Sequence, residues 1–568
     1  MVLPAHPTLS LPSISFTPPS QLSLWLHFLF YLLEDFELSF AVMEPAPEAN
    51  ELSVVPKQGK YQEGHLFSEQ VTSDHGVALT AAQNGLRNAA VVIFCISCIT
   101  FISSYLGGLV TVSVPQISSD LHLSPGMKLW PVSMYALGTG CTLLISGAVS
   151  DVVGNKQTFL TGCFLQSIFS MACGLAHSGK QLIIFRVISG IAASLCLPSA
   201  MSIITEHFPS GKFRNIALAL MGSGQPIGFG VGLLLGGVFA DTVGWRWGFY
   251  SAAIANSPVL LLSVQQLPGK DKQEGIIWRR LVFGIDWIGA LAASVGLALL
   301  SYALAVINDD VSKIRDATVI IFLCLFGSLI IFFIFWQGRQ ESHSRPTLIK
   351  NSLWKKVGFT CICINVFMIW GAFNAFEQMV NFFFQEVQRL SVLATSVRFI
   401  PVTILGLLTS LTTGIILHRV RADTLINGAT ILSSVSPLLL ALINPVWIYW
   451  RCAFFAMCLN PIAADVLFTV SSIIIAGMFP AETQGLAAGV FNTVSQFGRT
   501  IGLALVALIA NSITEKDSTL DKDSPGALMV GYRASFWFLF AMNITSLAVS
   551  LFGLRNIGNV GRKGSPDV

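Results

Sequence analysis

The chain has 568 residues, of which 53% are hydrophobic and only 11% are charged, and its formal net charge is +3. Soluble domains carry about 25% charged residues, so this composition excludes an ordinary soluble fold and favours a protein embedded in lipid. The nearly neutral charge gives no indication of a nucleic-acid partner.

The first 88 residues are rich in Pro, Ser and Glu, which is typical of disordered segments. An apolar stretch at 24–42 contains Glu34, Asp35 and Glu37. A carboxylate near the bilayer centre costs about 2.5–3.5 kcal/mol, so we do not expect this stretch to cross a membrane. It also lacks the basic flank and cleavage site of a signal peptide. We therefore predict that residues 1–88 form a disordered cytosolic tail.

Long apolar runs follow in regular succession. A helix of about 20 residues crosses a hydrocarbon core of about 30 Å. The runs predict fourteen membrane-spanning helices, near 89–112, 129–150, 157–177, 181–206, 215–240, 246–266, 283–306, 317–336, 357–380, 395–417, 424–443, 446–473, 485–510 and 533–554. One set of loops, together with the carboxyl-terminal tail, holds roughly twice as many lysines and arginines as the other set, which places both termini in the cytosol.

The predicted spans group as six, two and six. We therefore predict an all-α polytopic membrane protein of about 14 transmembrane helices, with one six-helix bundle at 89–266 and a second at 357–554. A linker at 267–356 supplies two extra transmembrane helices, and residues 555–568 form a cytosolic tail. An internally repeated arrangement of this kind is typical of secondary transporters.

Glycines line one face of the fifth predicted span. Gly224, Gly228, Gly232 and Gly236 recur every four residues, and Gly237 follows the last of them. That spacing puts four of them on one side of a helix. Small residues let two helices approach closely in lipid. The face is compatible with plain helix packing and with a tight hinge between the two bundles.

Two carboxylates lie inside long apolar runs, Glu377 in the ninth predicted span and Asp465 in the twelfth. Burial disfavours the ionised form of a carboxyl group. Such a group could take up and release a proton during a transport cycle. The alternative is a structural carboxylate that pairs with a buried arginine or amide.

Amide side chains form a polar stripe in the ninth predicted span, and the thirteenth span has a similar set. The two sets and their flanking aromatic residues are Trp370, Phe373, Asn374, Gln378, Asn381, Gln385, Asn492, Gln496 and Arg499. A polar stripe is unfavourable toward lipid, so we expect it to line a central cavity. Aromatic and amide walls suit amphipathic organic substrates. Interhelical hydrogen bonding is the alternative.

Several segments resemble motifs of the major facilitator superfamily. These are the glycine-rich stretch Gly224–Gly237 (its antiporter motif), the loop from Gly147 to Lys156 that contains Asp151 and Gly154, Arg186 followed by Gly190, and Trp130-Pro131 with Tyr135. The overall pattern resembles the fourteen-span drug:proton antiporters. It is most similar to fungal members, through the segments at 370–378, 460–465 and 491–496.

The resemblance implies roles for individual residues. Gly147, Asp151, Gly154 and Lys156 would form a cytosolic latch, and Arg186 would assist proton transfer at a neighbouring carboxylate. Leu106 stands where drug antiporters of this class often carry an aspartate, so the proton-coupling carboxylate is expected elsewhere.

The predicted function is export of a drug, toxin or specialised metabolite by proton antiport with alternating access. The expected partners are the lipid bilayer, protons and a small organic substrate, and we expect a monomer without a metal or cofactor. The expected location is the plasma membrane, with a vacuolar membrane as the alternative. An uptake carrier or facilitator for a nutrient or ion is the second hypothesis. An enzyme is disfavoured, because no histidine falls in the middle of a predicted span.

Overall fold

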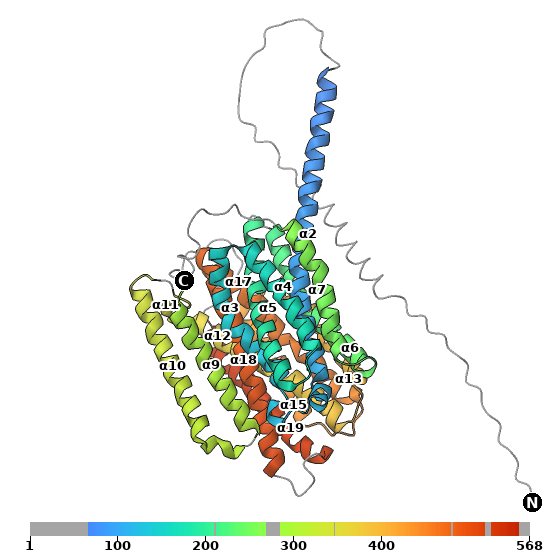
Figure 1. Ribbon diagram of the computed structural model, residues 1–568, viewed down its shortest axis with the longest axis vertical. Helices are drawn as coiled ribbons and strands as arrows, with labels where there is room; N and C mark the ends of the chain where they lie inside the picture. The colour runs from blue at the N-terminus through green and yellow to red at the C-terminus, as the bar shows by residue number, and fades with distance from the viewer. Residues whose placement is uncertain are drawn as a thin grey trace, which may run out of the picture. The chain divides into compact units, whose positions relative to one another are not determined.

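The computed structural model describes residues 66–208, 212–267, 285–309, 311–345, 347–417, 419–478, 481–516 and 524–555. All regular secondary structure in these residues is helical. Long helices run side by side in one bundle (Figure 1). The contact pattern divides the chain between Leu79 and Thr80, and Thr80–Val568 forms a single compact unit.

The first half of the bundle consists of α2 (Leu66–Asp120), η1 (Pro125–Met127), α3 (Trp130–Val153), α4 (Asn155–Gly174), α5 (Gly179–His207), α6 (Lys212–Asp241) and α7 (Arg246–Gln266). The linking segment contains α9 (Trp287–Asp309), η2 (Val311–Arg315), α10 (Ala317–Ser342) and the short α11 (Asn351–Trp354).

The second half begins with α12 (Val357–Phe382), which ends in a π-helical turn, η3 (Phe383–Val387). It continues with α13 (Val392–Arg398), α14 (Ile400–Ile416), α15 (Ala422–Ala441), η4 (Tyr449–Arg451), α16 (Ala453–Leu459), α17 (Pro461–Met478), α18 (Ala481–Lys516) and α19 (Pro525–Gly553).

The amino-terminal region differs from its sequence-based prediction. We expected a disordered tail up to residue 88, but the first helix already begins at Leu66, and residues 1–65 lie outside the described part of the chain. Extending an existing helix costs much less than nucleating one. The Ala, Leu, Gln and Glu residues between 66 and 88 have good helix propensity, so the helix of the first span can extend through them.

Thirteen helices of the described residues are long and apolar enough to cross a membrane. The predicted span that is missing from these thirteen is 157–177, which corresponds to α4. Its 20 residues correspond to about 30 Å, which is the thickness of a hydrocarbon core. However, it is less apolar than the other long helices, because polar residues such as Gln157 and Gln166 interrupt it. The fourteenth span therefore remains a prediction.

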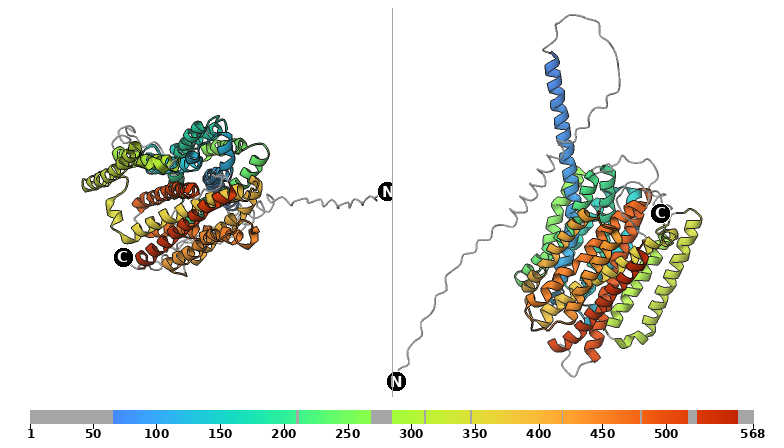
Figure 2. Two further views of the ribbon diagram at one scale, coloured as in Figure 1. Left: turned by 90° about the horizontal axis from the view of Figure 1, so that it is seen from below. Right: turned by 180° about the vertical axis from the view of Figure 1, so that it is seen from behind.

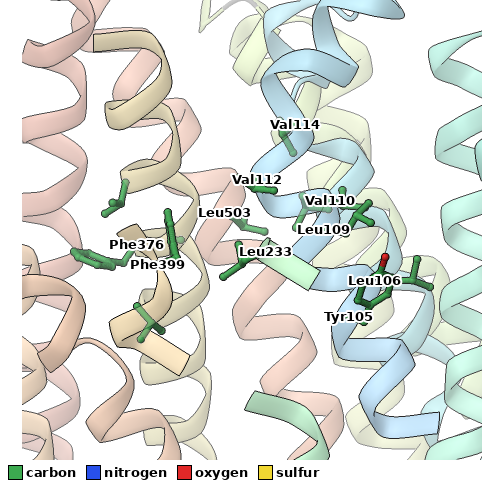
Figure 3. Close-up of a cluster of buried hydrophobic side chains, with 14 of the residues drawn as sticks. Tyr105, Leu106, Leu109, Val110, Val112, Val114, Leu233, Phe376, Phe399 and Leu503 are labelled. Carbon is green, nitrogen blue, oxygen red and sulfur yellow. The ribbon is translucent and has the colours of Figure 1, made fainter. Parts of the chain in front are cut away.

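The two halves meet along several helix pairs. Helix α3 packs against α18, and α6 packs against α13 and α14. An apolar layer at this junction contains Leu109 from α2, Leu233 from α6, Phe376 from α12 and Leu503 from α18 (Figure 3). Side chains from both halves thus share one core.

The linking pair lies at the periphery of the bundle (Figure 2). Helix α9 contacts both α3 and α18, and Ser294 donates a hydrogen bond to the carbonyl of Cys141 at 2.9 Å. Helix α10 packs mainly on α9, and only Val319 and Gln337 are buried among its residues. The outer face of α10 is therefore the part of this hairpin that borders lipid.

Candidate transport site

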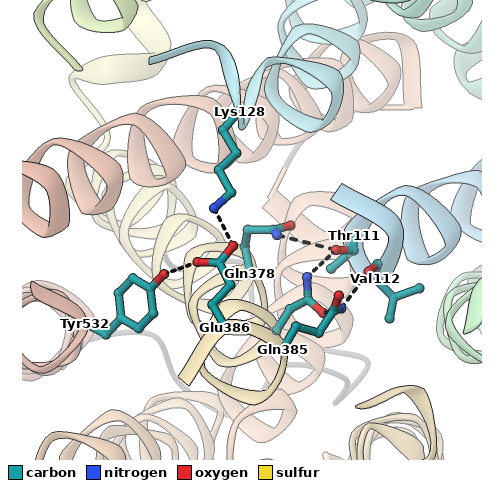
Figure 4. Close-up of polar contacts among 8 residues, drawn as sticks. Thr111, Val112, Lys128, Gln378, Gln385, Glu386 and Tyr532 are labelled. Atoms are coloured by element: carbon teal, nitrogen blue, oxygen red, sulfur yellow. Dashed lines mark hydrogen bonds and ion pairs between the residues drawn. The ribbon is translucent and has the colours of Figure 1, made fainter. Parts of the chain in front are cut away.

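A proline in α2 leaves a backbone carbonyl free in the middle of the bundle. Pro115 has no N–H, so the carbonyl oxygen of Thr111 lacks its helical partner. Asn381 of α12 donates to this oxygen at 2.8 Å, and Gln378 approaches it at 3.4 Å (Figure 4). The amides of the second half thus satisfy a polar group of the first half.

A third amide side chain, just after the end of α12, also bonds to the backbone of α2. Gln385, in the π-helical turn η3, donates to the carbonyl of Val112 at 2.8 Å and to the side-chain oxygen of Asn381 at 2.6 Å. Gln378, Asn381 and Gln385 therefore bind the backbone of α2 in this conformation. This matches the interhelical bonding that the sequence analysis left as an alternative to cavity lining.

An ionic contact closes the same end of the bundle. Glu386 accepts hydrogen bonds from Lys128, which lies between η1 and α3, and from the hydroxyl of Tyr532 in α19 (Figure 4). The Lys128 ammonium also lies 4.4 Å from the ring centroid of Phe382. Lys128 belongs to the first half and Glu386 to the second, so this contact joins the halves at the end that the loop charges assign to the outside.

Four charged side chains gather deeper in the bundle. Glu377 on α12 is 2% exposed, and among the described residues its Oε1 atom has no hydrogen-bond partner. Arg499 of α18 and Asp465 of α17 are both within electrostatic range of Glu377. Arg186 of α5 is within electrostatic range of Arg499 and repels it. The cluster therefore contains charges from both halves.

Arg186 is held by the first half alone. Its side chain is 1% exposed, its Nε donates to the carbonyl of Pro131 at 2.8 Å, and its guanidinium lies 4.4 Å from the ring centroid of Tyr135. Both terminal nitrogens are buried without a hydrogen-bond partner in the described residues. A buried cation with unused donors is energetically expensive and marks a place where a water molecule or an acceptor group of a substrate would be favourable.

Asp465 of α17 faces α14 within the second half. It is half-buried on α17, and a Cβ atom added at Gly406 of α14 would be only 2.8 Å from its Oδ2 atom. Asp465 therefore packs closely on α14, while it remains within electrostatic range of Glu377.

Aromatic side chains border this region at the other end of the amide stripe. The ring of Trp370 makes edge contacts with Phe373 and with Phe468 of α17, at centroid distances of 6.0 and 6.3 Å. The Nε1 atom of Trp370 is buried without a partner in the described residues, and its carbonyl accepts a hydrogen bond from Asn374 at 2.9 Å. These residues form an apolar surface with one hydrogen-bond donor, the Trp370 indole N–H, that has no partner in the described residues.

The residues predicted on the thirteenth span lie on α18, which faces α3 of the first half. Asn492, Gln496 and Arg499 are all half-buried. A Cβ atom added at Gly140 of α3 would be 3.0 Å from the Cβ of Gln496, so the two helices are close at this level. Arg499 and Gln496 therefore lie at the junction of the halves.

The glycine face of α6 divides between two partners. A Cβ atom at Gly228 would be 2.3 Å from the carbonyl oxygen of Phe101, and one at Gly232 would be 2.1 Å from that of Tyr105. Gly224 and Gly236 also face α2. In contrast, a Cβ atom at Gly237 would be 2.3 Å from Ser396 of α13. The four-residue repeat thus packs within the first half, and Gly237 contacts the second half.

The loop predicted as a cytosolic latch joins α3 to α4. Gly154 has φ of +109°, a conformation that favours glycine and lets the chain reverse there. Lys156 donates to the carbonyl of Leu267 at the end of α7, at 2.6 Å, where a cation also stabilises the helix dipole. Gly147 faces Pro198 of α5. The side chain of Asp151 lies outside the described part of the structure.

The contact between α2 and α12 leads to a testable prediction. Replacing Asn381 with leucine would leave the buried Thr111 carbonyl without its shortest hydrogen bond, which typically costs about 1–3 kcal/mol. We expect the halves to separate more often at this end. An engineered cysteine at Val112, which is 0% exposed, should then react roughly 10-fold faster with a membrane-impermeant maleimide added outside.

Asn365 provides the matched control for this prediction. It lies on the same helix but bonds within the second half, to the carbonyl of Cys361 and to Ser546. Asn365→Leu should leave the labelling rate unchanged. Equal labelling in the Asn381 and Asn365 variants would show that the α2 contact does not hold this end closed.

A bundle of long apolar helices that buries an arginine and a glutamate, Arg186 and Glu377, in its interior is typical of a multi-pass membrane transport protein. The chain belongs to the Major Facilitator Superfamily, whose family model matches residues 96–502. Among the described residues, no group of three His, Cys, Asp or Glu side chains is placed to hold a metal ion.

Three fungal relatives illustrate the range of this similarity. The chain is 36% identical to MFS-type transporter 1 of Pyricularia oryzae, over 83% of this chain and 85% of the relative. It is 26% identical to the efflux pump terG of Aspergillus terreus, over 76% and 80% of the two chains. It is 24% identical to the low affinity ammonium transporter of Saccharomyces cerevisiae, over 73% and 78%.

The fold is also similar to solved transporter structures. A bacterial homolog of the human lysosomal transporter Spinster, in an inward-facing and occupied conformation, superposes with a TM-score of 0.57 at 15% identity. The match covers 82% of this chain and 97% of the bacterial protein. These relatives and fold neighbours are transporters rather than enzymes.

Proposed function

We propose that this transporter exports small organic compounds in exchange for protons, by alternating access between its two halves. The observation that carries the proposal is the Glu377 side chain, which is 2% exposed and has no partner at its Oε1 atom among the described residues, on a helix that packs against α18, the helix of Arg499. The similarity to a protein named as an efflux pump supports the direction of transport.

The proposed coupling follows from the charges of the cluster. Ionised Glu377 attracts Arg499 and so offsets the repulsion between Arg499 and Arg186. Protonation of Glu377 removes that offset, and the two arginines of opposite halves then repel each other in a medium of low dielectric. A proton that enters would therefore favour separation of the halves at this level, and its release would favour closure.

The proposed substrate contacts are the aromatic group of Trp370 and Phe373 together with Asn374, Asn492 and Gln496. Aromatic rings supply contact area for an organic molecule, and amides supply a few hydrogen bonds. In this proposal Gln378 and Asn381 have a second role, because they exchange their bonds to α2 for bonds to substrate when the halves separate. The proposed location is the plasma membrane, with both termini in the cytosol.

Transport into inverted membrane vesicles tests the proposal. An acidic lumen imposed on such vesicles should drive accumulation of an exported compound from a panel of drugs and metabolites. Addition of a protonophore should abolish the accumulation, because the gradient is its only energy source. Accumulation that persists unchanged with the protonophore would exclude proton antiport.

Uptake of a small cation is the second candidate function, because one relative is named as a low affinity ammonium transporter. The same vesicles distinguish the two functions. An uptake carrier would move its substrate out of inverted vesicles, and it would do so for ammonium or methylammonium rather than for organic compounds of the panel.

A further inference from the structure

The end of α10 carries a cavity that the proposed transport cycle does not use. The cavity measures about 200 Å³ and is lined by Trp336, Arg339, Gln340, His343 and Arg345. Neither Arg339 nor Arg345 forms an ion pair with any described residue. Two guanidinium groups and an imidazole thus surround one cavity, and no described carboxylate forms an ion pair with either guanidinium.

Two carboxylates near the cavity accept hydrogen bonds from neutral groups. Glu341 accepts a hydrogen bond from the backbone N–H of Ser352 at 3.2 Å, which directs it toward α11. Asp286 accepts from Gly289, from the indole N–H of Trp336 at 2.8 Å and from the Gln337 amide at 2.6 Å. Neither carboxylate forms an ion pair with Arg339 or Arg345 in the described residues, so the two guanidinium groups are available to an anion from outside the protein.

Hydrogen bonds hold the backbone, the Trp336 ring and the His343 ring around the cavity. Asp286 holds Trp336, and the N–H of Arg345 donates to the carbonyl of Gln340 at 3.0 Å, which closes the turn after α10. The Nδ1 atom of His343 lies 2.9 Å from the carbonyl oxygen of Arg339. The backbone therefore positions Arg339 and Arg345 on either side of the turn after α10, with both side chains exposed.

The position of the cavity indicates which anion it meets. Arg339 lies about 33 Å along α10 from Ala317 at 1.5 Å per residue, slightly more than the thickness of a hydrocarbon core. The preceding residues of α10, such as Phe332 and Phe335, are exposed large apolar side chains that border lipid chains. The cavity is therefore level with lipid headgroups on the side that the loop charges assign to the cytosol.

We infer that this cavity binds the phosphate headgroup of an anionic phospholipid of the cytosolic leaflet. Arg339 and Arg345 would bind the phosphate oxygens, because the planar guanidinium group matches phosphate geometry. Trp336 lies at the depth where indole rings anchor helices at the membrane interface. The bound lipid would fix the α9–α10 hairpin against the bilayer, independently of what the protein transports.

Binding of short-chain lipids to the purified full-length protein in neutral detergent tests this inference. We expect saturable binding of dioctanoyl phosphatidylserine by thermophoresis, and at least roughly 10-fold weaker binding after the double substitution Arg339→Gln and Arg345→Gln. The double substitution Arg339→Lys and Arg345→Lys should retain binding. Retained binding in the lysine variant would show that the glutamine variant binds less because it has lost charge and not because it is misfolded.

The control variant also removes two positive charges from the predicted cytosolic side of the protein, but outside the cavity. The exposed residues Lys350 and Lys355 serve for this, and their double replacement by glutamine should change affinity less than about 2-fold. An equal loss in both double variants, or unchanged binding in the arginine variant, would overturn the inference. Equally tight binding of dioctanoyl phosphatidylcholine or of inorganic phosphate would also overturn it, because the site would then not select an anionic lipid.

Discussion

Replacing Glu377 with glutamine is expected to reduce proton-driven transport to the background of vesicles that lack the protein. Glutamine keeps the size of the side chain but cannot gain or lose the charge that offsets the repulsion between Arg186 and Arg499. Because the Glu377 side chain is 2% exposed and a neutral amide costs less to bury than an ionised carboxylate, glutamine at this position should not destabilise the fold.

Two measurements make this result specific. Size-exclusion profiles should be the same for the Glu377→Gln variant and the native protein, which excludes unfolding as the cause. The substitution Glu341→Gln removes a carboxylate that lies at the end of α10, away from the cluster, and should leave transport intact. Undiminished gradient-driven accumulation by Glu377→Gln would remove Glu377 from the coupling mechanism.

The substitution Gly232→Val is expected to have the largest effect on stability. Its Cβ would be 2.1 Å from the carbonyl oxygen of Tyr105 and 2.8 Å from its carbonyl carbon, so the backbones of α6 and α2 would have to separate. Overpacking of this kind typically costs about 1–3 kcal/mol. We expect a lower thermal midpoint and a lower yield of monodisperse protein in detergent.

Gly327 provides the matched control for Gly232. It also lies inside a long apolar helix, α10, but a Cβ atom added there meets nothing within 4 Å. Gly327→Val should therefore change stability by only about 0.5 kcal/mol. If the two valine variants were equally stable, close approach of α2 and α6 would not be the reason for glycine at position 232.

The sequence predicted much of the fold because lipid imposes a simple rule. Every backbone polar group in the hydrocarbon core needs a partner, so long apolar runs must become helices. Thirteen of the fourteen spans predicted from these runs are long apolar helices in the described residues. The exception, α4, has polar residues that weaken this signal, and its neighbours α5 and α7 pack along it.

The candidate site was only partly visible in the sequence. The spacing of Asn374, Gln378 and Asn381 showed a polar face, but it could not show that Asn381 bonds to the backbone of α2. Pro115 was the available signal, since a proline inside a helix always frees a carbonyl. The contact of Lys128 with Glu386 had no such signal, because its partners are far apart in the chain.

Composition and hydrophobic periodicity alone determined that this protein is a helical membrane protein with a few buried charges, because those properties depend on local transfer free energies. The tertiary structure alone determines which helices bring their charged side chains close to one another. The packing of α18, which bears Arg499, against α3 of the first half, and the division of the α6 glycines between α2 and α13, depend on how helices distant in sequence pack. No local pattern encodes that packing, because many pairs of helices have faces that could fit together.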